Sequence, residues 1–361
     1  MNLNFLTGTA AELIKVYPLI RMARERGHGV RVVMTGQSQE NFMMQYRDFG
    51  LPEDILVPLL SGGADLEKAS SAMRWFLRAL CVGRSTFRSK LLLSGDHDFT
   101  VVHGDTLSTL AGAWLSRRAG LTVIHVEAGL RSPSLFNPFP EEINRRLVSK
   151  LARLHMVPDQ KAQENLERAR VRGTIVNTGG NTLLDAVLMS AENGAKTGVR
   201  PFVLTNLHRF ENLNSSERWH KIVDTVERAA TKMPVVFVTH PQTRHKLSED
   251  RESMDRLQKA GVEIRDRMPF SSFIALLKDA SYLISDGGSN QEECSYLGKP
   301  CLLMRESTER QEGLDGCCVL SRFEQDKIDG FLADPSRYQR PAAPASASPS
   351  RKIFESLERD Q

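Results

Sequence analysis

Short apolar runs alternate with longer amphipathic stretches along most of this 361-residue chain. The runs are rich in β-branched residues and short enough to be buried parallel strands, and the stretches between them have helical spacing. The strand candidates of the first series are residues 4–7, 30–34, 99–102, 121–126, 156–157 and 174–176. Helices are predicted between them, for example at residues 10–26 and 109–119. This βαβ rhythm predicts a parallel sheet covered by helices.

A second series of the same kind begins near Phe202. Its strand candidates are residues 202–204, 235–238, 262–264, 282–284 and 301–304, with helices predicted at 218–232, 271–279 and 291–297. Two series predict an α/β chain of two Rossmann-type, doubly wound parallel-sheet domains that face each other across a cleft. We expect an N-terminal domain at residues 1–170 and a C-terminal domain at residues 171–340.

The segment 341–350 consists almost entirely of proline, alanine and serine. Such a composition favours an extended linker. The residues beyond it, 351–361, are predicted to form a terminal helix that joins the N-terminal domain.

Composition excludes several classes of protein. With 40% hydrophobic and 25% charged residues the chain is typical of a soluble globular enzyme, and no apolar run approaches the ~20 residues needed to cross a bilayer. The N-terminus lacks the basic region of a signal peptide, so a cytoplasmic protein is expected. The five cysteines lack zinc-like spacing, which favours free thiols. A net charge of +4, without a basic stripe carrying aromatics, fits anionic small molecules better than nucleic acid.

Carboxylates follow two of the strand candidates directly. Asp105 comes after the run 99–102, and Glu127 comes after the run 121–126. Glu141 and Glu142 form a further pair in the next segment. A carboxylate at the C-terminal end of a parallel strand points into the crevice where open α/β sheets bind ligands. Several acids in one crevice shift one another's pKa values, so that one can act as an acid and another as a base in proton transfer.

The segment 285–293, Ser-Asp-Gly-Gly-Ser-Asn-Gln-Glu-Glu, joins a strand candidate to a helix. Its two glycines allow close backbone approach, and exposed N–H groups at a helix N-terminus suit a diphosphate. Glu292 or Glu293 could then accept hydrogen bonds from ribose hydroxyls. The alternative is a purely structural helix cap, supplied by the side chain of Asp286, Ser289 or Asn290.

Weaker signals lie at other predicted strand ends. The turn at Gly8 opens the first helix and could bind an anion, although the glycine could equally serve only the turn. Lys15, two helical turns further on, could face the site or solvent. His208 and His240 end successive strands, where histidine can donate to phosphate or act as an acid or base. Arg310 could form a bidentate hydrogen bond with a phosphate, but a lone arginine is more often a surface residue.

Taken together, these motifs resemble the non-hydrolysing UDP-N-acetylglucosamine 2-epimerases. The likeness runs from Gly8 to about Phe331. It is carried by the segments 104–106, 125–131, 140–145, 208–209, 287–293 and 308–310. The resemblance implies a GT-B-like fold with a UDP-sugar bound between two Rossmann-type domains, a homodimer, and no metal or other cofactor. Neither nucleic acid nor membrane insertion is implied.

The resemblance also implies a reaction and its residues. The C2 proton of UDP-N-acetylglucosamine would be removed and UDP eliminated in anti fashion. The resulting 2-acetamidoglucal would then re-add UDP to give UDP-N-acetylmannosamine for cell-surface polysaccharide synthesis. The implied catalytic residues are Asp105, Glu127, Glu141 and His208. Which acid removes the proton and which returns it stays open. The implied substrate-binding residues are Lys15, Arg145, Arg209, Phe270, Gly287, Gly288, Ser289, Asn290, Glu293 and Arg310. Glu142 is expected to pair with nearby arginines instead.

The sequence also departs from the family's pattern. Ala10 and Ala11 stand where an arginine and a proline are usual, and the serine of the glycine-rich segment is shifted by two positions. Ser38 replaces a histidine in a region linked with allosteric UDP-N-acetylglucosamine binding, so such activation is not expected. The segment 341–350 replaces the family's usual C-terminal motif. These differences leave the identity of the sugar open.

Three alternatives use the same nucleotide-binding features. They are a GT-B glycosyltransferase, a hydrolysing epimerase that releases UDP and free N-acetylmannosamine, and a non-catalytic UDP-sugar-binding protein. A transferase needs one base for its acceptor, whereas Asp105, Glu127 and Glu141 supply three carboxylates. The acids therefore favour the epimerase.

Overall fold

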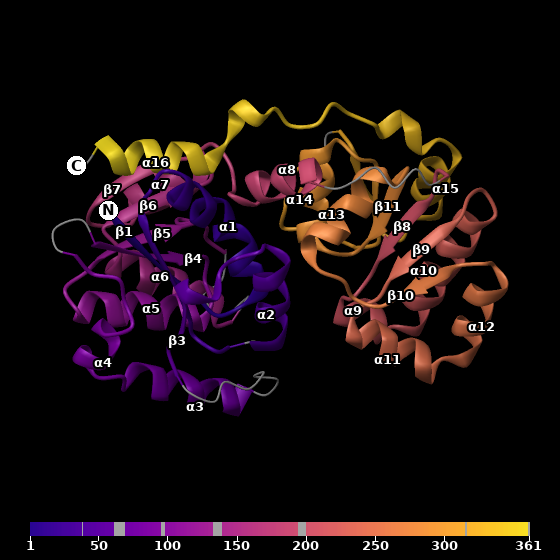
Figure 1. The fold of residues 1–361 in the computed structure, drawn as a ribbon. Coiled ribbons are helices and arrows are strands. Elements are labelled where there is room, and N and C mark those ends of the chain that lie inside the picture. The colour runs from indigo at the N-terminus through magenta and orange to yellow at the C-terminus, as the bar shows by residue number, and fades with distance from the viewer. Residues whose placement is uncertain are drawn as a thin grey trace. The chain divides into compact units, whose positions relative to one another are not determined.

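The computed structural model describes residues 1–37, 39–60, 69–94, 98–132, 139–193, 200–314 and 316–359, so Ser38 lies outside the described residues. The chain forms two compact units (Figure 1). The first unit comprises Met1–Ala186 together with Ser346–Gln361, and the second unit comprises Val187–Ala345. Each contains one parallel sheet.

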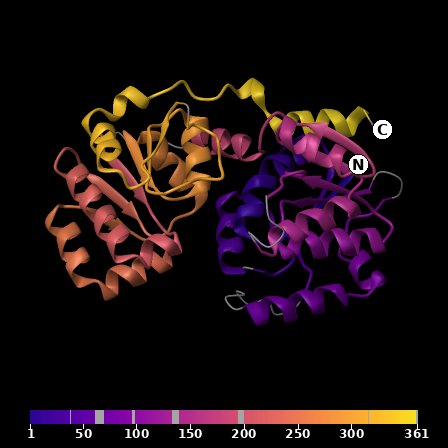
Figure 2. The same cartoon turned by 180° about the vertical axis from the view of Figure 1, so that it is seen from behind.

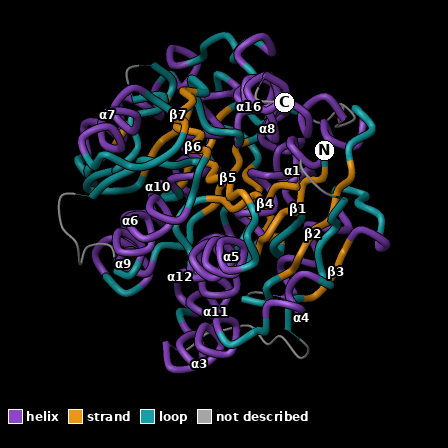
Figure 3. The backbone as a smooth tube through the Cα atoms, turned by 90° about the vertical axis from the view of Figure 1, so that its left-hand side faces the viewer, coloured by secondary structure: helices purple, strands orange, loops and turns teal. Residues whose placement is uncertain are grey.

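The sheet of the first unit has the strand order β3-β2-β1-β4-β5-β6-β7, and every pairing is parallel. Figure 3 shows this order running across the sheet from β7 to β3. The strands are β1 (Asn2–Thr7), β2 (Gly29–Met34), β3 (Leu56–Pro58), β4 (Asp98–His103), β5 (Thr122–Val126), β6 (Leu154–Val157) and β7 (Thr174–Asn177). The order reverses between β1 and β4, which is the switch point where such sheets bind ligands.

Helices cover both faces of this sheet. They are α1 (Ala10–Glu25), α2 (Gln39–Asp48), α3 (Ala69–Leu80), α4 (Arg84–Arg88), α5 (Leu107–Arg118), α6 (Glu141–Leu151), α7 (Gln160–Arg168) and α16 (Pro349–Arg359), with a short 3-10 turn, η1 (Glu53–Ile55). Helix α8 (Leu183–Asn193) spans the boundary between the two units. One core contains buried side chains of β1, α1 and α16, such as Phe5, Leu13 and Phe354. A separate core contains Trp75 of α3 and Val148 of α6. Two cores on one sheet confirm the doubly wound prediction.

The last helix, α16, completes the first unit. Ile353, Phe354 and Leu357 are at most 2% exposed within its core. The backbone N–H of Ser350 donates to Asp185 Oδ2 at 2.8 Å. Figures 1 and 2 show this yellow helix lying on the first unit, after the chain has returned from the second. The helix begins at Pro349, so the predicted linker 341–350 is two residues too long; proline favours the first turn of a helix.

The division of the chain also lies later than predicted. It falls between Ala186 and Val187, not between residues 170 and 171. The reason is β7, which pairs along its whole length with β6 and so belongs to the first sheet.

The second sheet has the order β10-β9-β8-β11-β12-β13 and is again wholly parallel. Its strands are β8 (Val203–Asn206), β9 (Val235–Val238), β10 (Glu263–Arg265), β11 (Tyr282–Ser285), β12 (Cys301–Leu303) and β13 (Cys318–Leu320). Its helices are α9 (Phe210–Leu213), α10 (Ser216–Ala230), α11 (Pro241–Glu249), α12 (Arg251–Lys259), α13 (Phe270–Asp279), α14 (Gly288–Leu297) and α15 (Gln325–Ala333), followed by the 3-10 turns η2 (Pro335–Tyr338) and η3 (Ala345–Ala347). The order reverses between β8 and β11, which gives this unit a switch point of its own.

All five cysteines are free thiols, as predicted, and four of them are buried in the second unit. Within the described ranges, no helix combines the length and the apolar character that a membrane span requires.

Candidate active site

A buried carboxylate joins the two loops at the switch point of the first sheet. Glu12 is 3% exposed. Its Oε2 accepts hydrogen bonds from the backbone N–H groups of Gly8, at 2.8 Å, and Thr9, at 2.9 Å. Its Oε1 accepts from the hydroxyls of Thr106, at 2.6 Å, and Thr109, at 3.0 Å. Glu12 therefore holds the turn after β1 against the turn after β4. This role of Glu12 was not predicted, although the sequence shows the capping-box spacing from Thr9 to Glu12.

Gly8 is required by the packing of its turn. A Cβ atom there would lie 2.0 Å from Ser108 Oγ and 2.2 Å from Thr35 Oγ1. The alternative that this glycine serves the turn is thus supported by geometry.

Glu127 has two cationic or ionisable neighbours. Its Oε2 lies 2.6 Å from Lys15 Nζ and 3.0 Å from His103 Nε2, and its side chain is 6% exposed. The residue directly follows β5 and has a φ of 61°, in the left-handed region. That conformation costs a non-glycine residue roughly 1–2 kcal/mol, and such strain concentrates at functional sites. Lys15 therefore faces the candidate site and not bulk solvent.

Asp105 is held by α6, the helix that carries Glu141 and Glu142. Arg145 donates through Nε to Asp105 Oδ2 at 2.8 Å, and its Nη2 lies 2.6 Å from the same oxygen. The side chain of Asn144 donates to the Asp105 carbonyl at 2.8 Å. Both partners lie on α6, so this helix fixes the loop after β4.

Glu141 and Glu142 begin α6 but differ in their surroundings. Glu142 is fully buried and accepts from the Ser132 N–H at 2.9 Å and from Arg146 Nε at 2.8 Å. Its predicted pairing with arginines is confirmed. By contrast, Glu141 Oε2 is buried and has no hydrogen-bond partner among the described residues. A carboxylate oxygen without a protein partner is available to a ligand.

His125, on the strand before Glu127, orients a neighbouring turn. His125 Nε2 lies 2.8 Å from the Gly104 carbonyl, and burial lowers the pKa of His125 to about 3. A neutral ring thus orients the turn before Asp105. No group of three or more His, Cys, Asp or Glu side chains in the described chain is arranged to hold a metal ion.

Asp286 organises the loops at the switch point of the second sheet. It is fully buried, and its carboxylate accepts from the backbone N–H groups of His208, at 2.9 Å, and Arg209, at 3.0 Å. The Asn212 side chain donates to it at 2.9 Å. The His208 ring stacks on His240, with centroids 4.4 Å apart. Burial lowers the pKa of His208, with Asp286 opposing the shift, so a neutral imidazole is favoured near neutral pH.

The N-terminus of α14 carries no side-chain cap. Its N-cap is Gly287, and no side chain accepts a hydrogen bond from the first turn. The predicted alternative of a cap from Asp286, Ser289 or Asn290 is therefore wrong, because these side chains have other roles. Ser289 is exposed, and Asn290 donates to Glu293 Oε2 at 2.8 Å. Uncapped N–H groups at a helix N-terminus form an anion site.

Burial raises the pKa of Glu293 to about 7, while the Asn290 hydrogen bond opposes the shift. Glu293 is 4% exposed. A carboxyl that titrates near neutral pH can either accept or donate a hydrogen bond to a hydroxyl.

Arginines lie beside the glycines of this helix. A Cβ atom on Gly288 would lie 3.7 Å from Arg310 Cγ and 3.8 Å from Arg209 Nη2. Gln291 holds the loop that carries Arg310. Its side-chain amide donates hydrogen bonds to the backbone carbonyls of Arg310, at 3.2 Å, and Glu312, at 2.8 Å. Gln291 was not predicted, since its role depends on a loop about twenty residues away. Phe270 begins α13 after Pro269 and is buried.

The predicted site residues thus fall into two groups, each within one unit. In the first unit, Lys15 contacts Glu127 and Arg145 contacts Asp105. In the second unit, the residues gathered at the start of α14 are His208, Arg209, Gly287, Gly288, Ser289, Asn290, Glu293 and Arg310.

Known proteins match this chain over most of its length. The family model described as UDP-N-acetylglucosamine 2-epimerase matches residues 21–336. The UDP-N-acetylglucosamine 2-epimerase of Methanocaldococcus jannaschii is 29% identical over 345 residues, which cover 91% of this chain and 90% of that protein. The enzyme of the same name from Bacillus subtilis is 31% identical over 278 residues, or 72% of each chain.

Solved structures match across both units. The UDP-GlcNAc 2-epimerase of Methanocaldococcus jannaschii has a TM-score of 0.80 at 25% identity, covering 99% of this chain and 100% of that chain. The Neisseria meningitidis enzyme bound to UDP-GlcNAc has a TM-score of 0.78 at 25% identity, with the same coverage. These matches confirm the predicted GT-B-like class. The chain therefore belongs to the UDP-N-acetylglucosamine 2-epimerase family of isomerases.

Proposed function

We propose that this enzyme epimerises C2 of a UDP-N-acetylhexosamine, with UDP-N-acetylglucosamine and UDP-N-acetylmannosamine as the leading pair. The observation that carries the proposal is the acid set of the first unit. Glu127 lies beside two cationic or ionisable groups, Asp105 beside an arginine, and Glu141 Oε2 has no partner among the described residues. Three carboxyls in three environments can divide the roles of base and acid.

The proposed reaction requires proton transfer on both faces of the sugar. A base takes the C2 proton, the C–H electron pair forms the C1–C2 double bond, and UDP leaves with the electrons of the C1–O bond. An acid then protonates C2 from the other face as the diphosphate oxygen re-forms the bond to C1. Glu127, Asp105 and Glu141 supply the proton-transfer groups in this proposal.

The second unit is proposed to hold the nucleotide. The uncapped N-terminus of α14 and the guanidinium groups of Arg209 and Arg310 would stabilise the leaving diphosphate. His208, neutral and beside Gly287, would donate to it. Glu293 would accept hydrogen bonds from the ribose hydroxyls, and Phe270 would flank the uracil. These groups can stabilise a diphosphate without a bound metal, so no cofactor is part of the proposal.

Incubation with UDP-N-acetylglucosamine in deuterium oxide, followed by NMR, tests the proposal. Deuterium should appear at C2 together with UDP-N-acetylmannosamine. Free N-acetylmannosamine with UDP would instead indicate a hydrolysing enzyme. If no UDP-N-acetylhexosamine exchanges its C2 proton, the proposal is wrong.

Substitution of the acids assigns their roles. We expect Asp105→Asn and Glu127→Gln each to lower C2 exchange by about 10²–10⁴-fold, the usual contribution of a positioned acid or base, with UDP affinity changed only a few-fold. Glu164→Gln, on the exposed surface of α7, is the matched control. Near-normal turnover in either variant would remove that residue from the catalytic set.

We also propose that the enzyme is a homodimer that associates through the first unit. Large apolar side chains are exposed on three neighbouring helices: Met73 and Leu77 of α3, each 54% exposed, Trp114 of α5, 46%, and Leu147 of α6, 41%. Helix α5 packs against both α3 and α6, so these side chains belong to one layer of the unit. Such groups mark interaction surfaces.

Light scattering after size-exclusion chromatography tests this surface. The wild type is expected to elute as a dimer and Leu77→Lys as a monomer, because a charge in an apolar interface is costly. Phe210→Lys is the matched control: Phe210 is 74% exposed but lies on α9 of the second unit. A dimer that survives Leu77→Lys and Trp114→Lys would place the interface elsewhere.

A further inference from the structure

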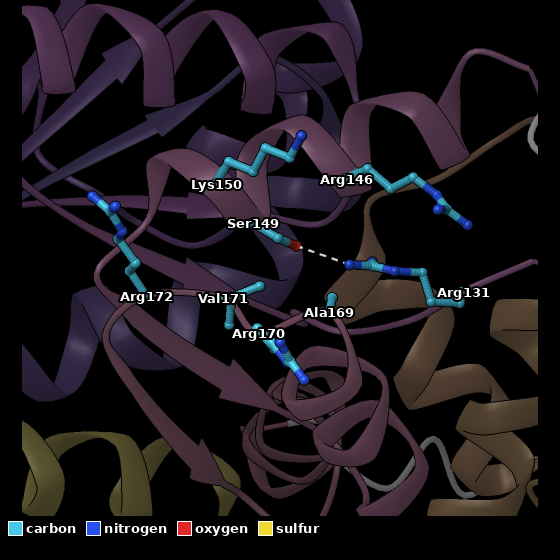
Figure 4. A pocket seen from close by; sticks show the side chains of 8 residues that line it. All are labelled: Arg131, Arg146, Ser149, Lys150, Ala169, Arg170, Val171 and Arg172. Atoms are coloured by element: carbon cyan, nitrogen blue, oxygen red, sulfur yellow. Dashed lines mark hydrogen bonds between the residues drawn. The ribbon is translucent and has the colours of Figure 1, made fainter.

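A strongly basic pocket lies in the first unit, between α6 and the turn that leads from α7 into β7. Its volume is about 460 Å³. Its lining residues are Arg131, Arg146, Ser149, Lys150, Ala169, Arg170, Val171 and Arg172. Figure 4 shows Arg146, Ser149 and Lys150 on one helix, Arg131 beside Ser149, and residues Arg170 to Arg172 across from them. No residue of the proposed active site lines this pocket.

The charge of the pocket is not balanced by the protein. Arg146 Nε lies 2.8 Å from Glu142, and Arg131 Nε lies 4.0 Å from the same carboxylate. In the described part of the chain, Lys150, Arg170 and Arg172 have no ion-pair partner. Among the described residues, only two of the five cations therefore lie beside a carboxylate, which also lies 3.6 Å from Arg145, and none of the lining residues is acidic. An anion in the pocket would relieve this repulsion.

Arg131 and Ser149 provide a preformed polar wall. Arg131 Nη2 donates to Ser149 Oγ at 3.2 Å, and Nη1 donates to the Leu130 carbonyl at 2.9 Å. The Arg131 side chain is only 14% exposed. Burial lowers the pKa of Arg131, an effect that Glu142 opposes and the neighbouring arginines reinforce. The guanidinium is thus oriented at the pocket and short of negative charge.

The backbone supplies an independent observation. Arg170 follows the last turn of α7 with a φ of 50°, in the left-handed region. The residue that follows a helix in the left-handed conformation is commonly glycine, because this conformation costs other residues roughly 1–2 kcal/mol. Here an arginine occupies the glycine position and its side chain lines the pocket. Strain of this kind is often kept for a functional reason.

We propose that this pocket binds a small phosphorylated ligand with two or more phosphate groups, at a site separate from the sugar nucleotide. Arginine matches phosphate geometry through paired N–H donors. The pocket volume falls within the range of small-molecule sites. The cations surround one hollow and do not form an extended stripe, which favours a compact anion over a nucleic acid. The inference does not depend on the proposed epimerase reaction.

Calorimetric titration of the full chain with inorganic tripolyphosphate, with and without saturating UDP, tests the proposal. A binding event that persists when UDP is present is expected. Lys150→Ala combined with Arg170→Gly should weaken it at least about tenfold, equivalent to ~1.4 kcal/mol. Arg168→Ala is the matched control, because Arg168 lies on α7 outside the pocket and pairs with Glu164. Its affinity should stay within about twofold of wild type.

Arg170→Gly also separates binding from folding. Removing the strained arginine should leave the melting temperature unchanged or raise it, while binding weakens. The proposal is overturned if UDP abolishes all tripolyphosphate binding, if the double variant binds like wild type, or if Arg168→Ala weakens binding as much as the double variant. If UDP itself fails to bind, only the epimerase proposal is contradicted. The titration without UDP would still compare the pocket variants and so test the phosphate site.

Discussion

At the scale of single residues, the acids of this enzyme are distinguished by what surrounds them. Glu12 and Glu142 are also buried carboxylates, but protein donors surround each of them. Glu141 has an oxygen without a protein partner among the described residues, and Glu127 adopts a strained conformation. Burial alone therefore does not distinguish the acids that we propose to be catalytic. Among these, an unmet hydrogen bond marks Glu141 and backbone strain marks Glu127, whereas Asp105 is marked by its arginine partner.

The buried carboxyl of Glu293 makes stability depend on pH. Its pKa is raised from 4.5 to about 7 in the folded protein, so the folded state binds a proton that the unfolded state has lost. The stabilising contribution is complete below about pH 4.5 and is lost as pH rises to about 7. We expect Glu293→Gln to reduce the fall in melting temperature between pH 5 and pH 8, by roughly 2–4 °C for each kcal/mol involved.

The control for this measurement is Glu306→Gln, since Glu306 is 53% exposed. Its melting profile should follow that of the wild type. An unchanged pH profile in Glu293→Gln would mean that Glu293 is ionised throughout this range.

At the scale of elements, each proposed half-site is formed by the turns that follow neighbouring strands. Glu12 fastens the turns after β1 and β4, and Asp286 fastens the turns after β8 and β11. The same device, a buried carboxylate accepting backbone N–H groups, therefore recurs at both switch points. Each one fixes a loop that carries proposed site residues.

The turn after β1 should be intolerant of a side chain at Gly8. Gly8→Ala places a methyl group 2.0 Å from Ser108 Oγ, which overpacks the switch point and is expected to cost about 1–3 kcal/mol. Urea denaturation measures the effect. Gly330→Ala is the control, because a Cβ there meets no atom within 4 Å and α15 should gain helix propensity. Equal stability of both variants would show that the turn can relax.

The strands were the most predictable elements. The run 235–238 was predicted with its observed bounds, because four β-branched or aromatic residues in a buried strand leave little ambiguity. The short edge strands β3 and β13 were missed, whereas β10, an edge strand of the same length, was predicted one residue early because Val262 and Ile264 are β-branched.

The pairing of site residues was less predictable than the residues themselves. Asp105 and Glu127 were found because they follow strands. The contact of Asp105 with Arg145 joins residues 40 positions apart and depends on how α6 packs. The contact of Lys15 with Glu127 spans 112 positions. Local sequence patterns carry no information on contacts between residues so far apart in the chain. Only the tertiary structure therefore shows that Lys15 faces the candidate site and not solvent.

At the scale of the whole molecule, the first unit is built from both ends of the chain. Phe354 of α16 is fully buried in the core formed with β1 and α1, and Arg26 lies over its ring, 5.0 Å from the centroid. We expect Phe354→Ala to destabilise the first unit by about 3–5 kcal/mol. Hydrogen exchange should rise in β1 and α1 but not in β8.

Arg351→Ala, on the exposed side of the same helix, is the matched control, with an expected change within about 0.5 kcal/mol. If exchange in β1 stays at its wild-type rate in Phe354→Ala, the terminal helix contributes little to the first core.

The return of the chain to its first unit has a consequence for synthesis on the ribosome. Domains generally fold as units while the chain emerges, at about 5–20 residues per second. Here the seven-stranded sheet is translated before the second unit, but the helix that covers part of its core is translated only after that unit. The apolar surface beneath α16 thus stays exposed for as long as the whole second unit takes to be made.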